Sequence, residues 1–389
     1  MARIIVTGYM LRHPVAGNLL AYFQYVLGFH RLGHEVMYLE ESGWSYSCYD
    51  PEKREWQDHP ETGLRIVSEL MAEHGLDIPL CYVNRETGTV IGAEWNEIKR
   101  MIGAADLLIN VGGVCWLPEF LLCRRRLLID LDPLFTQVEM FGAKSIDDYQ
   151  YHFSYGSNIG KPFCTIPTDG VDWLPTVPPV VSGLWNDAAA PSKDAPFTTI
   201  ANWSAYGGIT YEGEFYGQKD EEFLRLINLP QHTLQKLELA ISGAEPQVRE
   251  RLKKVGWSVR DAGEEVSTDI DTYRKYIFNS RGELSAAKNA YVKTNSGWFS
   301  DRSVCYLAAG LPVILQNTGF TDWLSADGGV QAFSTLDEAV GCIEKVNADY
   351  LNHRRAARKI AEEVFSYKVV LPRLIDIAVG AQRSNSKLI

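Results

Sequence analysis

The chain has 389 residues, of which 46% are hydrophobic and 22% are charged, and its formal net charge at pH 7 is -11. This length suffices for two domains of ordinary size, and the composition is that of a folded globular protein rather than a disordered or fibrous one. The negative net charge argues against nucleic acid as a partner, because a phosphate backbone requires a basic surface.

Cysteine spacing and the N-terminus indicate the compartment. The seven cysteines form no C-x-x-C pair and no zinc-like spacing with histidine, so we expect reduced thiols and no metal site. The sequence starts directly with an apolar strand, without a signal-peptide pattern, and it contains no run of eighteen apolar residues. A cytoplasmic protein without a membrane span is therefore expected.

The N-terminal residues predict the start of an α/β domain. An apolar strand at 4–7 is followed by a glycine-containing loop, a helix ending near Gly33, and a second strand at 35–39. This order is typical of a Rossmann-like half. A dinucleotide fingerprint is excluded, because Gly8 and Gly17 are nine residues apart and Pro14 lies between them.

Two carboxylates end a later strand of the first half. The pattern predicts a helix at 62–76, a strand at 105–110 and another apolar strand that leads into Asp130 and Asp132. Strand ends line the ligand crevice of open α/β sheets, so we favour a catalytic or acceptor-side role for this pair over a metal site. A role in ordering the loop is the alternative.

The middle of the chain predicts a junction between two domains. Residues 151–181 are rich in aromatic residues, proline and glycine, which suits either rigid packing at a domain junction or a sugar-stacking surface, and we favour the junction. Residues 186–194 have the composition of a linker. A new strand at 197–203 then begins the second half, and residues 207–217 are predicted to form a hairpin-like insertion.

The second half continues as alternating strands and helices. Strands are expected at 237–242 and 257–261, and helices at 245–255, 269–279, 336–346, 353–364 and 369–379.

The stretch from Gly297 to Phe320 carries the strongest functional signal. A helix is predicted to start after Ser300 and to end at Gly310, and it is followed by a buried strand at 313–315 and a loop at 317–319. Free backbone N–H groups, Arg302 and Ser303 would converge at the helix start, which suits a diphosphate. An ordinary packing unit with a solvated arginine remains the alternative.

This stretch resembles the signature of the GT-B glycosyltransferases. Leu-Ala-Ala-Gly-Leu-Pro-Val-Ile and the following glycine loop match the glycogen-synthase-like branch of that fold at five positions, namely Phe299, Ala308, Gly310, Pro312 and Val313. In that branch two acids contact the donor sugar and the ribose. Gly297 and Cys305 occupy their positions here, so neither acidic role is carried over, and Asp301 with Arg302 is the candidate replacement.

The resemblance implies a fold and a division into domains. It implies an α/β protein with two Rossmann-like doubly wound domains that face a central cleft, and a C-terminal helix that crosses back to the first domain. The expected boundaries are 1–182 for the acceptor-binding domain, 183–194 for the linker, 195–365 for the donor-binding domain and 366–389 for the crossing helix and tail.

The resemblance also implies an activity: transfer of a sugar from a nucleotide-sugar to a small-molecule or glycan acceptor, without metal or cofactor. Lys219 occupies the place of the family's diphosphate lysine if the insertion at 207–217 is allowed. A nucleotide-sugar epimerase of the same architecture and a non-catalytic nucleotide- or sugar-binding protein remain alternatives. The expected donor-binding residues are Asn202, Ser204, Lys219, Ser300, Asp301, Arg302, Ser303, Thr318, Gly319 and Phe320.

An inverting transferase also requires a base. His13, in the loop after the first strand, is the candidate, with Asp130 or Asp132 orienting its imidazole, because an unperturbed histidine pKa near 6.5 suits proton transfer. A loop-ordering histidine without chemistry is the alternative. For the anion site we expect Arg302→Ala to weaken nucleoside diphosphate binding and to leave the fold intact.

Overall fold

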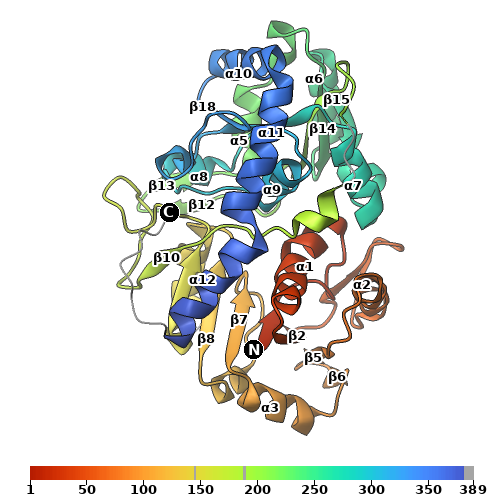
Figure 1. Cartoon of the computed structure of the whole chain (residues 1–389), viewed down its shortest axis with the longest axis vertical. Coiled ribbons are helices and arrows are strands. Elements are labelled where there is room, and N and C mark those ends of the chain that lie inside the picture. Colours follow the sequence, from red (N-terminus) through yellow and green to blue (C-terminus); the bar gives the residue numbers. More distant parts are fainter. Residues whose placement is uncertain (144–145, 187–189, 381–389) are drawn as a thin grey trace.

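The computed structural model describes residues 1–143, 146–186 and 190–380. Two α/β halves follow one another along the long axis of the molecule, the first coloured red to yellow and the second green to blue (Figure 1). Parts of the predicted linker and tail, residues 187–189 and 381–389, lie outside the described residues.

The first half contains an eight-stranded sheet with the order β10-β9-β8-β7-β1-β2-β5-β6. Neighbouring strands are parallel, except that β5 and β6 are antiparallel. The chain moves outward from β1 through β2 and β5 and then returns to add β7, which creates a topological switch point between β1 and β7. The strands are β1 Arg3–Thr7, β2 Glu35–Ser42, β5 Leu80–Asn84, β6 Thr89–Ile91, β7 Leu107–Val111, β8 Arg126–Asp130, β9 Tyr151–Ser154 and β10 Trp173–Pro175.

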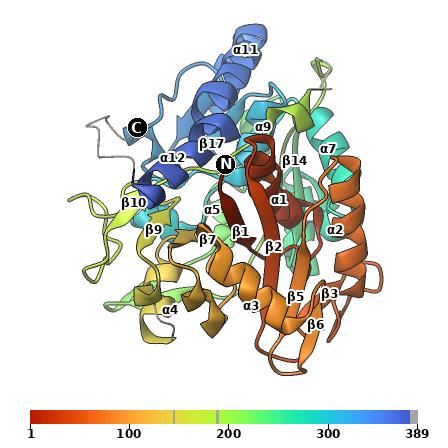
Figure 2. The same ribbon diagram turned by 60° about the horizontal axis from the view of Figure 1, so that its bottom comes forward.

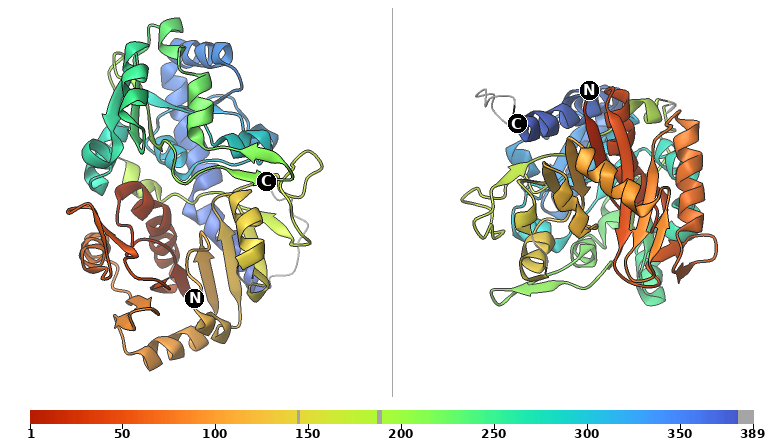
Figure 3. Two further views of the ribbon diagram at one scale, coloured as in Figure 1. Left: turned by 180° about the vertical axis from the view of Figure 1, so that it is seen from behind. Right: turned by 90° about the horizontal axis from the view of Figure 1, so that it is seen from below.

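Helices cover both faces of this sheet because successive strand residues point to opposite sides. Ile4 and Val6 of β1 belong to the hydrophobic cluster that contains α1, whereas Ile5 packs with Ile98 of α3 on the other face. Figure 3 shows α3 at the end of the molecule farthest from the second half. The helices are α1 Ala16–Arg31, α2 Glu61–Glu73, α3 Trp95–Ala104 and α4 Phe135–Ala143, and β3 Cys48–Asp50 and β4 Glu55–Gln57 form a separate hairpin.

The second half contains a six-stranded parallel sheet with the order β15-β14-β11-β16-β17-β18. It repeats the doubly wound order of the first half, so a second switch point lies between β11 and β16. The strands are β11 Phe197–Asn202, β14 Leu237–Ser242, β15 Ser258–Asp261, β16 Gly282–Ser285, β17 Val313–Gln316 and β18 Val330–Phe333.

The predicted insertion is an antiparallel hairpin, β12 Ile209–Tyr211 with β13 Glu214–Tyr216. The helices of this half are α5 Lys219–Arg225, α6 Pro246–Lys254, α7 Ile270–Phe278, α8 Asn289–Lys293, α9 Asp301–Ala308, α10 Leu336–Ala348, α11 Tyr350–Ile360 and α12 Tyr367–Val379. Short 3₁₀ or π turns lie at Pro118–Leu122, Ile146–Asp148, Ser182–Trp185, Leu229–His232, Ala262–Val266, Phe320–Asp322 and Ala361–Phe365.

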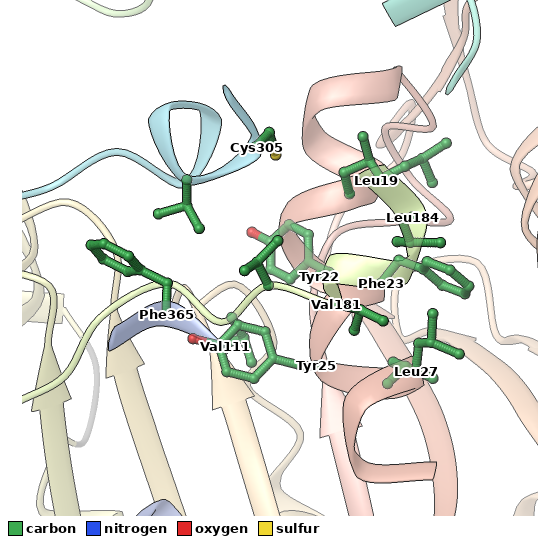
Figure 4. Packing of buried hydrophobic residues seen from close by; sticks show 14 of the residues in the cluster. Leu19, Tyr22, Phe23, Tyr25, Leu27, Val111, Val181, Leu184, Cys305 and Phe365 are labelled. Atoms are coloured by element: carbon green, nitrogen blue, oxygen red, sulfur yellow. The ribbon is translucent and has the colours of Figure 1, made fainter. Parts of the chain in front are cut away.

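One hydrophobic cluster joins the two halves. Tyr22 and Phe23 of α1 pack in it together with Cys305 of α9 and Phe365 (Figure 4). The C-terminal helix α12 returns to the first half, where it contacts α1 (Figure 2). The side chain of Leu371 is so close to Gly28 that a Cβ there would approach it to 2.5 Å. Packing of this kind fixes the relative position of the two sheets.

The aromatic stretch at 151–181 contributes β9 and β10, which the sequence did not reveal, and a loop that contacts the second half. Asn158 is buried, and its Nδ2 donates hydrogen bonds to the carbonyl oxygens of Asn295 and Gly319, both at 3.1 Å. Gly319 has a φ of +88°, which glycine adopts without strain. This loop therefore ties the first half directly to the end of the signature stretch.

Candidate functional site

A cavity of about 500 Å³ lies between the two halves. Its second-half wall is formed at the carboxyl ends of β11 and β14, where ligands of doubly wound sheets bind. It is lined by His13, Val15, Gly17, Asn18, Ala21, Tyr22, Tyr49 and Leu131 from the first half and by Ile200, Ala201, Asn202, Ser242, Ala262, Gly263, Ser267, Tyr273, Asp301 and Arg302 from the second.

A buried carboxylate holds the loop after β1 in place. Glu40, at 0% exposure near the end of β2, accepts hydrogen bonds from the backbone N–H groups of Leu11 and Arg12, each at 2.8 Å, and from the hydroxyl of Tyr38 at 2.6 Å. The Arg12 guanidinium completes the network with Nε 3.1 Å from Glu40 Oε1. Because backbone and side chain are both bound, the position of the next residue, His13, is fixed.

His13 lines the cavity but lies in an aromatic environment. Its ring centroid is 5.6 Å from that of Tyr9, 5.3 Å from that of Tyr49 and 5.9 Å from that of Trp56. Burial lowers the pKa of His13 to about 4, so the imidazole is neutral at pH 7 and a weaker base than a free histidine. The assignment of His13 as a base assumed an unperturbed pKa near 6.5, and its pKa in the structure is lower.

Neither predicted carboxylate orients His13, and that part of the prediction is wrong. Asp130 is buried and accepts hydrogen bonds from Gln137 Nε2 at 2.9 Å, from Ser154 Oγ at 2.6 Å and from the backbone N–H of Asp132 at 2.8 Å. These bonds order the loop after β8, which is the alternative that the sequence left open. Burial raises the pKa of the Asp130 carboxyl.

Asp132 instead connects the two halves of the molecule. Its carboxylate accepts two hydrogen bonds from Lys288 Nζ, at 2.9 and 2.7 Å, and one from the hydroxyl of Tyr291. The Lys288 ammonium also donates to the Tyr206 hydroxyl at 2.6 Å and lies 4.7 Å from the ring centroid of Phe135. The structure therefore gives Asp132 a role in holding the domains together.

Arg302 is a buried structural residue rather than a solvated one. Its side chain crosses the β11–β16 switch point, with Nε 2.6 Å from Glu283 Oε1, Nη1 2.6 Å from the carbonyl oxygen of Ile200 and Nη2 2.8 Å from Ser285 Oγ. Arg302 is 9% exposed and Glu283 is 0% exposed. Contrary to the sequence-based expectation, we therefore expect Arg302→Ala to destabilise the fold, because the substitution would leave a buried carboxylate without its cation.

Ser300, the N-cap residue of α9, makes no side-chain capping bond to the helix. The Ser300 hydroxyl accepts no backbone N–H and lies 3.4 Å from Asp301 Oδ1 instead. The buried Ser303 hydroxyl has no hydrogen-bond partner in the described part of the chain. Asp301 Oδ1 accepts the N–H of Arg302 at 2.8 Å, so one N–H group of the first turn is already bound. The remaining N–H groups of a helix start are suited to a negatively charged ligand. Ser300, Arg302, Ser303, Thr318 and Phe320 all line one small hollow there.

Lys219 lies close to two other cations, Arg302 and Lys288. It is the first residue of α5 and half-buried, and it interacts electrostatically with Arg302 and Lys288. Within the described ranges no acceptor forms a hydrogen bond with its ammonium. Burial, with repulsion from these two cations, lowers the pKa of Lys219 to about 7. Such a cation is stabilised by an incoming anion.

Of the remaining predicted donor residues, only two line the cavity. Asn202 and Asp301 line the cavity, whereas Ser204 is exposed on the loop after β11 and outside its lining. The glycine loop is internally bonded instead: the Thr318 hydroxyl donates to the carbonyl oxygen of Trp298 at 2.6 Å, the Gly319 N–H donates to Asn317 Oδ1 at 2.9 Å, and Phe320 packs on Phe299.

Sequence reasoning missed several residues of the cavity. Ser242 ends the predicted strand at 237–242, so its position at a strand end was an available signal. For Tyr49 and Tyr273 the sequence contained no signal that would have placed them in the cavity. Tyr49 lies on a short hairpin without clear strand periodicity, and Tyr273 is on the inner face of a helix whose pattern indicates only packing.

In the described residues, no group of three or more His, Cys, Asp or Glu side chains is arranged to hold a metal ion. None of the described helices combines the length and the hydrophobicity that crossing a bilayer requires. The seven cysteines are free thiols.

The sequence matches no protein-family model and no curated protein. Solved structures match over nearly the whole chain. An α-glucosyltransferase in complex with UDP-glucose and DNA aligns with a TM-score of 0.61 at 11% identity, covering 97% of this chain and 99% of that chain. AviGT4, a glycosyltransferase involved in avilamycin A biosynthesis, aligns with a TM-score of 0.55 at 14% identity, covering 98% and 99%.

A sucrose-phosphate synthase from Thermosynechococcus elongatus aligns with a TM-score of 0.52 at 11% identity, covering 97% of this chain and 98% of that chain. At these identities the likeness is one of fold. It extends over both doubly wound halves and the cleft between them. The chain therefore has the GT-B fold and is a distant structural relative of the GT-B glycosyltransferases.

Proposed function

We propose that the chain is a glycosyltransferase that takes its sugar from a nucleotide-sugar, with UDP as the favoured nucleotide. The observation that carries the proposal is the cavity between the halves, which combines the strand ends of β11 and β14 with the start of α9 and with Lys219 nearby. UDP is favoured because an α-glucosyltransferase of the same fold was solved with UDP.

In the proposed reaction the bond between the anomeric carbon and the diphosphate oxygen breaks and a bond to the acceptor oxygen forms. The proton of the acceptor hydroxyl passes to solvent, so the products are the glycoside, the nucleoside diphosphate and a proton. Negative charge develops on the leaving diphosphate, so groups that stabilise it accelerate the reaction. We assign this role to Lys219 and to the N–H groups at the start of α9. Asn202 and Asp301 are assigned to the rest of the donor, and Arg302 supports their wall of the cavity.

Thermal-shift screening with nucleoside diphosphates and nucleotide-sugars tests this proposal, because a ligand of the folded state raises the unfolding temperature by mass action. We expect UDP and one UDP-sugar to raise it and inorganic phosphate to have little effect. Product analysis with the donor alone then distinguishes a transferase from an epimerase, which needs no acceptor. If no nucleotide raises the unfolding temperature, the proposal is wrong.

The pKa of Lys219 predicts how UDP binding depends on pH. Below about pH 7 the ammonium is already protonated and attracts the diphosphate, whereas above it the group must take up a proton on binding. We therefore expect the affinity for UDP to fall from about pH 7 to about pH 9, by up to about tenfold per pH unit. Calorimetry in buffers of different ionisation enthalpy checks this, and a flat profile would contradict it.

Metal independence is a separate prediction. The described residues offer no cluster of metal ligands, and the proposed diphosphate site relies on cations and N–H groups of the protein. We expect UDP release to continue at an unchanged rate after treatment with EDTA. Loss of turnover that manganese or magnesium restores would instead indicate that a metal ion holds the diphosphate.

The expected cytoplasmic location and the absence of nucleic acid among the partners also stay predictions. The net charge of -11 supports the second, although an α-glucosyltransferase of the same fold was solved with DNA.

A further inference from the structure

A second, larger hollow adjoins the site cavity. It has a volume of about 750 Å³ and lies between α2 and the β3–β4 hairpin of the first half and α7 of the second. The two hollows share Val15, Tyr49, Gly263 and Ser267 in their walls, so they meet at the hairpin. A molecule in the larger hollow can therefore reach the cavity assigned to the donor.

Tyr49 lies at the junction between the two hollows, and its ring packs against two other aromatic side chains. Its ring centroid lies 5.3 Å from that of His13 and 5.4 Å from that of Trp56. The tip of the same hairpin is tied to the second half by the ion pair of Arg54 with Glu264. In the described part of the chain the Tyr49 hydroxyl has no hydrogen-bond partner. The junction thus offers a fixed aromatic ring with an unused hydroxyl.

The charge of the larger hollow limits what it accepts. Its lining contains seven carboxylates and three guanidinium groups, so it keeps an excess of negative charge, although five of the carboxylates form ion pairs with arginines. Burial also lowers the pKa of His74 in this wall, which keeps that imidazole neutral. Carboxylates accept hydrogen bonds from hydroxyl groups but repel phosphates. The hollow therefore favours an uncharged polyol over a phosphorylated molecule or a nucleic acid.

From these observations we propose that the acceptor is an uncharged saccharide whose sugar ring stacks on Tyr49, with the rest of the molecule in the larger hollow. The apolar C–H face of a pyranose packs on an aromatic ring, and its hydroxyls find acceptors in the surrounding carboxylates. Tyr49 is then the residue that positions the acceptor hydroxyl at the donor cavity. This inference rests on the proposed glycosyltransferase function.

The test measures UDP release from the UDP-sugar selected by thermal shift, with maltose, cellobiose, lactose, glucose 6-phosphate or a short DNA duplex as acceptor. We expect one of the neutral disaccharides to accelerate release. Tyr49→Ala should raise the KM for that disaccharide about tenfold, and Tyr49→Phe should keep it near the wild-type value. Phe163→Ala, which removes an exposed aromatic ring outside both hollows, is the matched control.

Acceleration only by glucose 6-phosphate or DNA, no acceleration by any disaccharide, or an unchanged KM in Tyr49→Ala would each overturn the inference. These outcomes leave the proposed function standing as long as UDP binds. A chain that binds no nucleotide would remove the proposed function itself. An unchanged unfolding temperature of Tyr49→Ala separates loss of stacking from misfolding of the hairpin.

Discussion

Arg302→Ala should destabilise the folded protein by about 3–5 kcal/mol, the range for breaking a buried ion pair. The substitution removes three hydrogen bonds and leaves Glu283, at 0% exposure, without its cation. Urea unfolding measures the effect as a lower midpoint at an unchanged slope. A loss below about 1 kcal/mol would show that Glu283 does not depend on this partner.

Two further variants separate the ion pair from a general packing defect. Arg302→Met combined with Glu283→Leu removes both charges and fills similar volume, so it should recover much of the lost stability. Lys253→Ala removes an exposed lysine whose partner, Glu250, is also on the surface, and it should change the free energy of unfolding by less than about 1 kcal/mol.

Lys219→Met should lower the affinity for UDP by about 10- to 100-fold, which corresponds to losing a charge-assisted bond of roughly 1.5–3 kcal/mol. The same substitution should stabilise the ligand-free protein at neutral pH, because the ammonium is repelled by Arg302 and Lys288. A gain in stability together with a loss of UDP affinity would identify Lys219 as a residue that binds the ligand at the expense of the free protein's stability. Lys254→Met, which alters an exposed lysine on α6, should change neither property.

The pH dependence of the Lys219 contribution has a defined sign. Its folded-state pKa of about 7 is below the unfolded value of about 10.4, so the unfolded chain binds the additional proton between these values. The Lys219 ammonium therefore lowers the free energy of unfolding by its full amount below about pH 7, and this destabilisation decreases as the pH rises. Lys219→Met should show its greatest gain in stability at the acidic end of this window, and a gain that grows with pH would contradict the account.

Much of the fold could be predicted because its signals are local. Apolar runs such as 237–242 and helix stops such as Gly310 with Pro312 marked the elements around the two switch points, and the structure has them within a few residues. The short strands β9 and β10 were missed because aromatic residues, proline and glycine are interspersed in and around them, and β16 was missed because its four residues, Gly282–Ser285, are too few to show a period.

The candidate site was less predictable, because partners distant in sequence decide what each side chain does. The signature stretch identified the start of α9, but only the structure shows that Arg302 is bound by Glu283 and that Asp132 is bound by Lys288. A carboxylate or a guanidinium at a strand or helix end is equally compatible with a ligand and with an internal ion pair. The burial of each partner, which tertiary packing sets, distinguishes the two.

The central claim is that the cavity between the two halves binds a nucleoside diphosphate. Calorimetric titration of the wild-type chain with UDP at about pH 7 tests it most directly, with Lys219→Met in parallel. The account predicts saturable binding at one site per chain that the variant weakens about tenfold or more. Absence of binding by the folded wild-type protein, or equal affinity in the two proteins, would contradict it.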